Sequence, residues 1–495
     1  MSNTMSDKNS VNFTRREFLG TVAAAAAFTI VPRSVLGGPG YTAPSDMVNL
    51  AGIGVGSQGG GDIQNIATPD VPIKRRPFGG GGMLMQPYAG IQPPRRERRA
   101  SDNPVQMGDA EKQSFKHANI YALCDVDHDY SGHILAGYPK AKKYTDFREM
   151  IDKEKEIDAV LIGTPDHTHA VIAAYAMKAG KHVYCEKPVI HKISEAEKLI
   201  DAQRVSGMYF QAGSQGMASL GNRKARQLLR SGAIGKVNFI DGQFTGAPGT
   251  LGYYPVADNA SEKTIWWKRF LGNAPKHKFD PQRFFYWRNW KDYGTGIAGD
   301  LFVHVLASLH YITDAIGPEK VYTTGGIRHY TDGYRDTPDV MLAYLDYPDR
   351  EDLGAFTVQL GANYVDGVSR KWGSMDFRIV GSEGTLDVAW DKVTLKTLHK
   401  ADTAFLQALE PIGQGIDTPV VKSEKEIEFI ASSDYKGGHY DHFENFFTGI
   451  RNKTPLVCDV MFSVRSAAPA LLSYESYERG EAVYWDAENL KERKK

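Results

Sequence analysis

The chain has 495 residues, of which 42% are hydrophobic and 24% are charged, a mixture typical of folded proteins with a sizeable core. The length predicts two or three domains, and the composition excludes a chain that is disordered throughout. The 59 basic side chains balance the 59 acidic ones, so the net charge does not indicate a nucleic-acid partner or an anionic membrane surface. Three cysteines are too few for a disulfide framework.

The first 37 residues predict a targeting segment rather than part of a folded domain. Residues 14–19 include Arg15 and Arg16, and an apolar run follows over residues 20–31. This pattern resembles a twin-arginine export signal, and a short amphipathic helix is the alternative. The run is shorter than a membrane span, and no later stretch is long and apolar enough to cross a bilayer. We therefore expect a periplasmic or otherwise exported protein without a membrane span.

Residues 46–210 predict an α/β domain with a doubly wound parallel sheet of the Rossmann type. Short apolar runs, suited to strands that are buried on both faces, alternate with segments of helical periodicity. The expected strands are residues 48–53, 120–124, 159–162 and 183–185, and the helix expected over 169–179 stops before Gly180.

Residues 68–116 predict an insertion into this domain. Its portion 74–99 contains seven lysine and arginine residues against the single acidic residue Glu97, together with glycine and proline clusters. We interpret the insertion as a surface loop, and a basic flap over the phosphates of a cofactor is the alternative.

Residues 211–485 predict a second domain of the α+β class, built on a large and mostly antiparallel sheet. Strand-like runs with alternating apolar and polar residues follow one another with few helices between them, as expected for a sheet with one buried face. The expected strands are residues 237–244, 321–327, 340–347, 355–360 and 375–380.

A glycine-rich motif of the form G-x-G-x-x-G directly follows the first predicted strand. It consists of Gly54, Gly56 and Gly59, with Ser57 and Gln58 between the second and third glycines. In dinucleotide-binding folds such glycines permit a tight turn, close approach of the backbone to a pyrophosphate, and close packing of a helix on a strand. The helix that follows offers its N–H groups to the phosphates. We therefore expect these five residues to bind a dinucleotide, and a plain tight turn is the alternative.

Asp125 follows the second predicted strand, where dinucleotide-binding folds carry an acidic residue that hydrogen-bonds the adenosine ribose. It lies 125 − 54 = 71 residues after Gly54, rather than about 20, and the insertion accounts for most of the excess. A carboxylate at this place repels a 2′-phosphate, which favours NAD over NADP. Because the twin-arginine route carries folded proteins, often with cofactor already loaded, we expect the cofactor to be tightly bound.

Three sequence blocks resemble the Gfo/Idh/MocA family of oxidoreductases, which includes glucose-fructose oxidoreductase and inositol dehydrogenases. They are G-T-P-D-H-T-H at residues 163–169, G-K-H-V-Y-C-E-K-P at 180–188 and G-D-L-F-V-H at 299–304. The segments 442–446 and 451–455 resemble the closing helix of the family, so the match covers about residues 47–480. The resemblance implies an N-terminal domain that binds NAD(P). It also implies a C-terminal sheet domain that forms the substrate cleft and commonly joins subunits, here into a dimer or tetramer.

The resemblance also implies the residues of the cofactor site. Thr164, Pro165, His169 and Glu186 would belong to it, with Lys187 at its nicotinamide end.

The catalytic group implied by the resemblance comprises Lys187, Asp300 and His304. Oxidation of a secondary alcohol needs a group that takes the hydroxyl proton and a charge that holds the developing alkoxide. Lys187 suits the second task and can serve the first. Asp300 and His304 are four residues apart, so on a helix the carboxylate can orient an imidazole that shuttles the proton. A capping aspartate beside a packed core histidine is the alternative.

Residues 253–293 contain twelve aromatic residues. Because the C–H faces of sugar rings pack on aromatic rings, Trp287 and Arg288 are candidates for contact with a carbohydrate substrate. A hydrophobic core under a long loop is the alternative.

His439 and His442 have the spacing of one helical turn, with Asp441 between them. The sequence puts no further ligand beside them, so we expect no metal site.

These observations predict an exported NAD(P)-dependent oxidoreductase that transfers a hydride between a nicotinamide and a secondary hydroxyl of a sugar, glycoside or polyol. One version would keep its cofactor bound while oxidising one sugar and reducing another. An NAD-dependent glycoside hydrolase, which oxidises C3 transiently and then eliminates the leaving group, is the first alternative. A non-catalytic sugar-binding relative is the second. The expected partners are a small carbohydrate and further copies of the chain.

Overall fold

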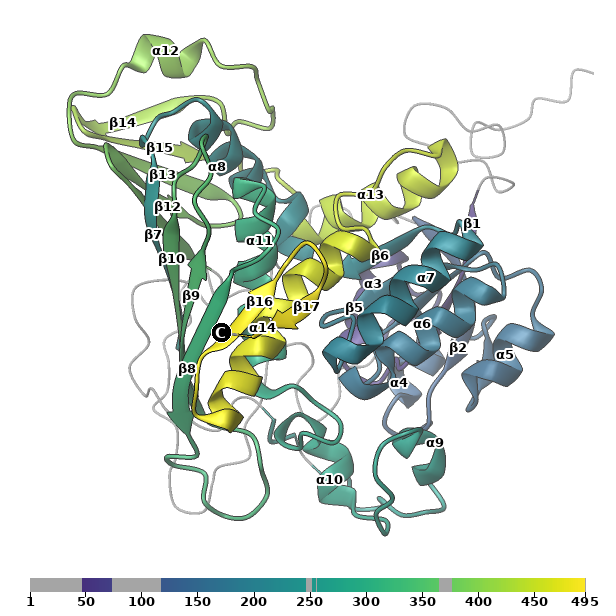
Figure 1. The fold of residues 1–495 in the computed structure, drawn as a ribbon. Coiled ribbons are helices and arrows are strands. Elements are labelled where there is room, and N and C mark those ends of the chain that lie inside the picture. Colours follow the sequence, from purple (N-terminus) through teal and green to yellow (C-terminus); the bar gives the residue numbers. More distant parts are fainter. Residues whose placement is uncertain (1–46, 74–116, 246–251, 255, 365–375, 495) are drawn as a thin grey trace, which may run out of the picture. The chain divides into compact units, whose positions relative to one another are not determined.

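The computed structural model describes residues 47–73, 117–245, 252–254, 256–364 and 376–494 (Figure 1). The chain separates into two units, residues 1–47 and Val48–Lys495, and all described helices and strands lie in the second. The predicted export signal and the basic portion of the insertion, residues 74–99, lie outside the described residues.

The first sheet has six parallel strands in the order β3-β2-β1-β4-β5-β6. They are β1 (Val48–Ile53), β2 (Ala118–Cys124), β3 (Lys142–Tyr144), β4 (Ala159–Ile162), β5 (His182–Glu186) and β6 (Phe210–Gly213). The helices between them are α3 (Gln58–Ile66), α4 (Gly132–Gly137), α5 (Phe147–Lys153), α6 (His169–Lys178) and α7 (Ala196–Ser206). The strand order reverses at β1, and ligands of doubly wound sheets bind at the carboxyl ends of the strands at such a point.

Both faces of this sheet are buried, which explains the unbroken apolar runs of its strands. In β1, Leu50 packs with Ile63 of α3 on one face, whereas Ile53 belongs to the hydrophobic core on the other face. A strand that alternates between two cores needs apolar residues at successive positions.

Helix α13 (Gly438–Asn452), from the C-terminal part of the chain, packs onto the first sheet. Its Phe443, Phe446 and Phe447 are fully buried, and the first two contact the ring of Tyr184 in β5. A helix of the second predicted domain therefore packs on the first domain, across the predicted boundary at residue 210. The strand β6 also crosses this boundary and ends at Gly213.

The second sheet has eleven strands in the order β14-β15-β13-β12-β11-β7-β10-β9-β8-β16-β17 (Figure 1). All neighbours are antiparallel except β7 and β10. The strands are β7 (Val237–Thr245), β8 (Lys320–Gly326), β9 (Val340–Tyr347), β10 (Phe356–Asn363), β11 (Phe377–Gly381), β12 (Gly384–Val388), β13 (Lys392–Thr397), β14 (Pro419–Ser423), β15 (Glu426–Ile430), β16 (Val483–Asp486) and β17 (Lys491–Arg493).

Helices cover one face of the second sheet. Helix α8 (Leu220–Arg230) packs on β12 and β13, α14 (Val460–Arg479) packs on β8, and α11 (Val303–Thr313) lies between these two helices. In β9 the buried Ala343 alternates with Leu342 and Tyr344, which are 38% and 41% exposed. This alternation is the pattern expected for a sheet with one buried face.

The remaining helices are short. They are η3 (Asp166–Thr168), η4 (Ile193–Glu195), η5 (Gln215–Ala218), α9 (Trp267–Leu271), α10 (Pro281–Phe285), η6 (Trp287–Asn289), the π-helical turn η7 (Ala298–Phe302) and α12 (Thr403–Gln407).

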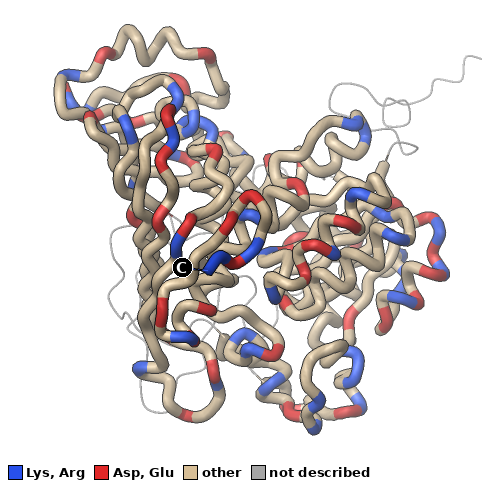
Figure 2. Tube along the Cα trace, in the orientation of Figure 1, with Lys and Arg blue, Asp and Glu red and all other residues tan. Residues whose placement is uncertain are grey.

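The predicted fold class, a doubly wound parallel sheet followed by an α+β domain with a large and mostly antiparallel sheet, is confirmed. Among the residues described, no helix combines the length and apolar character that a membrane span requires. In Figure 2 basic and acidic residues are interspersed along the described chain, in keeping with the balanced net charge.

Candidate active site

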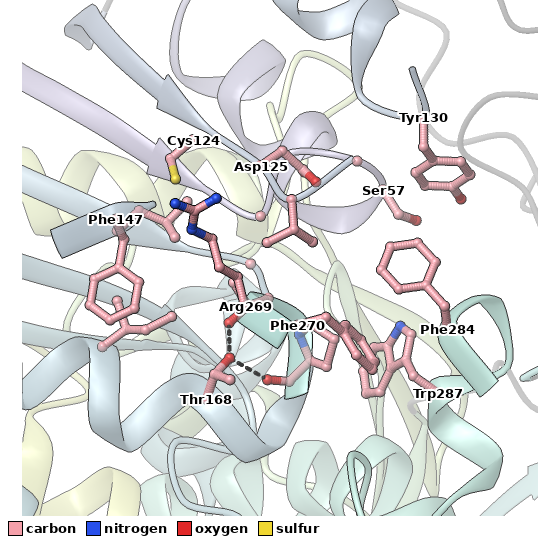
Figure 3. Close-up of a pocket in the computed structure, with 18 of the residues that line it drawn as sticks. Ser57, Cys124, Asp125, Tyr130, Phe147, Thr168, Arg269, Phe270, Phe284 and Trp287 are labelled. Carbon is pink, nitrogen blue, oxygen red and sulfur yellow. Dashed lines mark hydrogen bonds between the residues drawn. The ribbon is translucent and has the colours of Figure 1, made fainter. Parts of the chain in front are cut away.

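A pocket opens at the carboxyl ends of β1, β2 and β4, and about 1000 Å³ of free space, part of it open solvent, lies within it. The predicted site residues that line it are Gly54, Gly56, Ser57, Asp125, Thr164, Pro165, Trp287 and Arg288. Figure 3 shows Asp125 and Ser57 on one side of the pocket and Phe284 and Trp287 on the other. The pocket lies where the strand order of the first sheet predicts a ligand.

The glycine motif makes the turn between β1 and α3. Gly54 has a positive φ of 76°, and its N–H donates to the Cys124 carbonyl oxygen at 2.8 Å. A Cβ at Gly59 would lie 2.3 Å from the Gly54 carbonyl oxygen, and one at Gly163 would lie 2.6 Å from the Cα of Gly59. Since no larger residue fits at these positions, α3 begins in close contact with the turns that follow β1 and β4.

Asp125 ties the end of β2 to the glycine motif. Its carboxylate accepts the N–H of Val55 at 2.8 Å and the N–H of Asp127 at 2.9 Å. Burial raises the pKa of Asp125 to about 6, although both hydrogen bonds act in the opposite direction. The carboxylate oxygens can accept further hydrogen bonds, such as those from ribose hydroxyls.

A segment of the second domain, residues 265–288, contributes to the pocket lining Arg269, Phe270, Phe284, Phe285, Trp287 and Arg288; we call it the wall segment. Ile265 forms an isolated bridge with Asp127, and the N–H of Trp266 donates to the Val126 carbonyl oxygen at 3.0 Å. Arg269 Nε donates to Asp146 Oδ2 at 3.1 Å. The wall segment is therefore hydrogen-bonded to the loops that follow β2 and β3.

The aromatic residues of the wall segment serve two purposes. Trp267 and Phe270 pack with Tyr293 in a small hydrophobic core, as the alternative interpretation expected. Phe284 and Trp287 line the pocket, as does Phe270. An apolar lining interrupted by a few polar groups is typical of cofactor pockets.

Lys187 follows β5 and is held by a single residue. Its Nζ donates to the Asp300 backbone oxygen at 2.9 Å and lies 3.3 Å from Asp300 Oδ1. Arg288 Nε lies 3.2 Å from Asp300 Oδ2, so the carboxylate stands between two cations. The side chains of Lys187 and Asp300 are 14% and 4% exposed, which makes this ion pair nearly dry. Because Arg288 also lines the pocket, Asp300 links the pocket to Lys187.

The expected pairing of Asp300 with His304 is not found. Asp300 lies in the π-helical turn η7 and His304 in the first turn of α11, so the two residues do not share one face of a regular α-helix. The Asp300 carboxylate bonds to Lys187 and Arg288, and within the described ranges no hydrogen bond joins it to His304.

His304 carries an uncharged imidazole near pH 7. Burial holds the pKa of His304 well below its ordinary value, and the positive charges of Lys187 and His439 act in the same direction. A neutral imidazole can accept a proton, so the property needed for the predicted proton transfer is present even without Asp300 as a partner.

His169 connects two of the family motifs. It is 1% exposed, with Nδ1 2.7 Å from the Pro188 carbonyl oxygen and Nε2 2.7 Å from the Thr164 carbonyl oxygen. The ring therefore positions the residues after β4 against those after β5. Its contact with the cofactor stays a prediction.

Glu186, Gln58 and Gly59 lie outside the lining of the pocket. Glu186 Oε1 accepts the side-chain N–H of Gln215 at 2.7 Å, and burial raises the pKa of Glu186 to about 7. Gln58 Nε2 donates to Asp62 Oδ1 at 3.0 Å, and Asp62 is fully buried beside Glu186. These residues therefore form a hydrogen-bonded layer behind the pocket instead of lining it.

Two further residues were not predicted from the sequence. Asp166 is 2% exposed and accepts the Thr295 hydroxyl at 2.6 Å, and its pKa is raised by burial and by the neighbouring Asp300. Its position inside the T-P-D-H motif was a signal that could have identified it. Gln215 has no such signal, because its partner Glu186 lies 29 residues earlier in the chain.

The residues of the pocket fit a dinucleotide. The glycine turn leaves the space that a Cβ would fill, Asp125 offers acceptors at the end of β2, and the aromatic side of the pocket suits a planar ring. Lys187 and Asp300 do not line the pocket themselves, and Asp300 joins Lys187 to Arg288, which does.

Comparison with protein families agrees with this geometry. The profile described as the NAD-binding Rossmann fold of an oxidoreductase family, GFO_IDH_MocA, matches residues 106–214, and the C-terminal alpha/beta domain of the same family matches residues 272–484. The chain belongs to the Gfo/Idh/MocA oxidoreductase family. The glycine motif precedes the first match, which is explained by the insertion between β1 and β2. The first domain is thus the NAD-binding domain of a Gfo/Idh/MocA protein.

Among relatives in the Gfo/Idh/MocA family, an inositol 2-dehydrogenase of Salmonella typhimurium is 28% identical over 25% of this chain and 37% of its own. A 2,7-anhydro-N-acetylneuraminate hydratase of Mediterraneibacter gnavus is 21% identical over 47% of this chain and 52% of its own. The chain thus spans about half or less of the length of these relatives.

Solved structures share the fold over a greater length. An inositol dehydrogenase homologue of Azotobacter vinelandii, solved with NADH and myo-inositol, is 16% identical, with a TM-score of 0.58 over 89% of this chain and 98% of its own. A levoglucosan dehydrogenase solved with NADH and levoglucosan is 17% identical, with a TM-score of 0.58 over 88% of this chain and 99% of its own.

Proposed function

We propose that this protein transfers a hydride between NAD and a secondary hydroxyl group of a sugar, glycoside or polyol. The observation that carries the proposal is the geometry of Lys187, which is held by Asp300 beside Arg288 of the dinucleotide pocket. Relatives and structural neighbours include inositol and levoglucosan dehydrogenases, which supports a polyhydroxylated substrate.

Lys187 would bind the oxygen of the reacting hydroxyl group. An ammonium has three N–H donors, and the backbone oxygen and carboxylate of Asp300 take two of them. The third remains for a substrate oxygen, where a charge-assisted hydrogen bond stabilises the negative charge that develops as the proton leaves. Asp300 and Arg288 keep the ammonium oriented throughout.

His304 would take the hydroxyl proton. Its imidazole is neutral near pH 7, because its pKa is well below the ordinary value, and it is close enough to Lys187 to feel that charge. When bound, NAD supplies the acceptor for the hydride that the carbon loses. In the reverse direction His304 would return the proton to the same oxygen.

The cofactor of the proposal is NAD, retained between turnovers. The Asp125 carboxylate would repel the 2′-phosphate of a bound NADP, which favours NAD over NADP. The contacts of the wall segment with Val126, Asp127 and Asp146 hold one side of the pocket in place, which supports slow release of a bound dinucleotide. Retention of the cofactor is the reason for a second candidate function.

The second candidate is a glycoside hydrolase or lyase that oxidises its substrate only transiently. An enzyme that holds its dinucleotide must restore the oxidised form within each cycle, and a reaction with no net redox change does so without a second substrate. The hydratase among the relatives is compatible with such chemistry. The two candidates use the same residues and differ in the product.

The proposal includes export and self-association. Export rests on the twin-arginine pattern in residues 1–37. Association rests on the exposed face of the second sheet, where Tyr322 of β8 and Tyr344 of β9 stand opposite each other and are 44% and 41% exposed. With Leu342 on the same face, they form an apolar patch of the kind that subunit interfaces cover.

The first test is the cofactor and product balance of the purified protein. Mass spectrometry of the denatured protein should identify NAD, and added myo-inositol, glucose or levoglucosan should produce bound or free NADH. Release of free sugar from aryl glycosides without net NADH would select the second candidate. Absence of both products, with NAD bound, would reject the proposal in favour of a binding protein.

A further inference from the structure

His439 lies in the first turn of α13, just before the segment 442–446 that resembles the closing helix of the family, and this helix packs against η5. The preceding residue, Gly438, would bring a Cβ within 3.1 Å of the Gln215 carbonyl oxygen in η5. The His439 ring packs on Trp390, with the ring centroids 5.6 Å apart. Trp390 in turn covers Gly216, where a Cβ would lie 2.4 Å from its Nε1. Helix α13 and Trp390 therefore hold the imidazole beside η5.

The same short helix η5 supports Lys187. Gln215 of η5 donates its side-chain N–H to Glu186 Oε1 at 2.7 Å, and Glu186 directly precedes Lys187. Both Gln215 and Glu186 are buried, at 3% and 4% exposure, so this link does not depend on mobile surface side chains.

Helix α11, which carries His304, is anchored to η5 from another side. Asn222 Nδ2 donates to the Gly216 carbonyl oxygen at 2.7 Å and lies 2.9 Å from the Ser308 hydroxyl oxygen. Ser308 lies about one turn after His304 in α11. The two histidines, from helices far apart in the sequence, are therefore fastened to the same element.

The electrostatic behaviour of His304 agrees with this arrangement. Burial lowers its pKa most, and Lys187, as well as His439 when it is protonated, lowers it further, so both groups act on the His304 ring. Burial also lowers the pKa of His439. Within the described chain neither imidazole forms a hydrogen bond to another residue. Each neutral ring thus has one donor and one acceptor to offer, which is what a hydroxyl group requires.

We propose that His439 is a further substrate-binding residue, which hydrogen-bonds a hydroxyl group next to the one bound by Lys187. The substrate class is then a carbohydrate or polyol with at least two neighbouring hydroxyl groups. Trp390 positions the His439 ring. This inference rests on the proposed function, since it assumes a carbohydrate at Lys187.

The kinetic test compares His439→Ala and His439→Gln with the wild-type protein at saturating NAD. With the fastest substrate among myo-inositol, glucose and levoglucosan, His439→Ala should raise KM on the order of tenfold, as expected for one lost hydrogen bond. The value of kcat should change far less, and His439→Gln should recover part of the loss because its amide can donate and accept. The matched control is His399→Ala, a histidine on the exposed turn after β13.

A second measurement does not require turnover. Diethyl pyrocarbonate modifies accessible imidazoles, and peptide mass spectrometry reports the rate at His439. Each sugar is added separately and in excess to the wild-type protein as purified. Modification of His439 should become slower, whereas modification of His399 should not change.

The outcomes separate this inference from the proposed function. If the wild-type protein oxidises none of the three sugars and cleaves no glycoside, the proposed function fails, but protection of His439 still decides the inference. Protection by none of the sugars overturns it. So does a His439→Ala protein that binds NAD normally and has an unchanged KM, because the imidazole would then have no contact with substrate.

Discussion

Lys187 is held by both the backbone oxygen and the carboxylate of Asp300, at 2.9 Å and 3.3 Å, across 113 residues of sequence. One residue therefore brings the end of β5 and the π-helical turn before α11 together. The ammonium can move little without breaking both contacts, and this fixes its direction relative to the dinucleotide pocket.

Replacing Lys187 with methionine should abolish turnover and leave NAD bound. Methionine keeps much of the length of the side chain but has no charge and no N–H donor, so the developing alkoxide loses its partner. We expect kcat to fall on the order of 10³-fold. The measurement is single-turnover NADH formation, with bound NAD quantified by mass spectrometry. Lys198→Met, on the exposed face of α7, is the control and should behave as the wild-type protein. Turnover that survives in Lys187→Met would reject the assigned role.

The pH profile should reveal His304 as a base that is already deprotonated. Burial holds the pKa of His304 well below its ordinary value, so we expect the imidazole to stay neutral as the pH is lowered from 8 to 6. At saturating NAD, kcat should therefore stay level across this range and fall only at lower pH. In His304→Gln the value of kcat on this plateau should be about 10²-fold lower than in the wild-type protein. A midpoint near 6.5 that persists in His304→Gln would show that another group supplies the base.

The affinity for NAD should depend on the ionisation of Asp125. Its pKa is raised to about 6, so the carboxylate is charged above that pH and protonated below it. Only the charged form accepts hydrogen bonds from both ribose hydroxyls, and the affinity should therefore rise as the pH increases through 6. Calorimetry with the cofactor-free protein measures this. In Asp125→Asn the dependence should vanish.

Removal of the Asp125 carboxylate should change cofactor choice. Asp125→Ala should weaken NAD binding roughly ten- to a hundredfold, as expected for lost hydrogen bonds to a charged group. Binding of NADP should change much less, since its 2′-phosphate gains from the loss of the negative charge. Equal losses for the two cofactors would mean that Asp125 supports only the glycine turn, through Val55.

The wall segment should control how fast the dinucleotide leaves. Arg269→Ala removes the hydrogen bond to Asp146, and because Arg269 is 37% exposed the contact is a modest one. We expect NAD to dissociate about two- to fivefold faster, measured by displacement in stopped flow. Arg204→Ala removes an exposed ion pair with Asp201 that is remote from the pocket, and it should leave the rate unchanged. Equal NAD dissociation rates in the two variants would show that the wall segment does not retain the cofactor.

The exposed tyrosines of the second sheet should hold subunits together. Introducing Tyr322→Asp and Tyr344→Asp at the cross-strand pair puts two negative charges on the apolar patch. Light scattering should show a dimer or tetramer for the wild-type protein and a monomer for the double variant. A wild-type monomer at micromolar concentration would refute the association. Replacement of Val205, which is 79% exposed on α7, is the matched control.

The elements of both sheets could be predicted where the pattern is local. The runs 48–53, 159–162 and 340–347 coincide with β1, β4 and β9. Strand β13 was not predicted, because charged residues at both ends obscure its apolar centre. The glycine motif could be recognised because its three glycines form a single turn and therefore lie close together in the sequence.

The sequence by itself determined the candidate site residues and the elements on which they lie. Gly54, Asp125 and Lys187 all follow apolar strands, and residues at the ends of parallel strands gather at one edge of a sheet. Family resemblance supplied the remaining assignments.

Only the tertiary structure decided the partners. Asp300 bonds to Lys187 and not to His304, α13 packs on Tyr184 of the first sheet, and Arg269 reaches Asp146. Backbone propensity and hydrophobic periodicity act over a few residues, whereas each of these contacts joins segments that meet only after the elements have packed. Their energies depend on burial and distance in the folded protein, for which a local pattern carries no information.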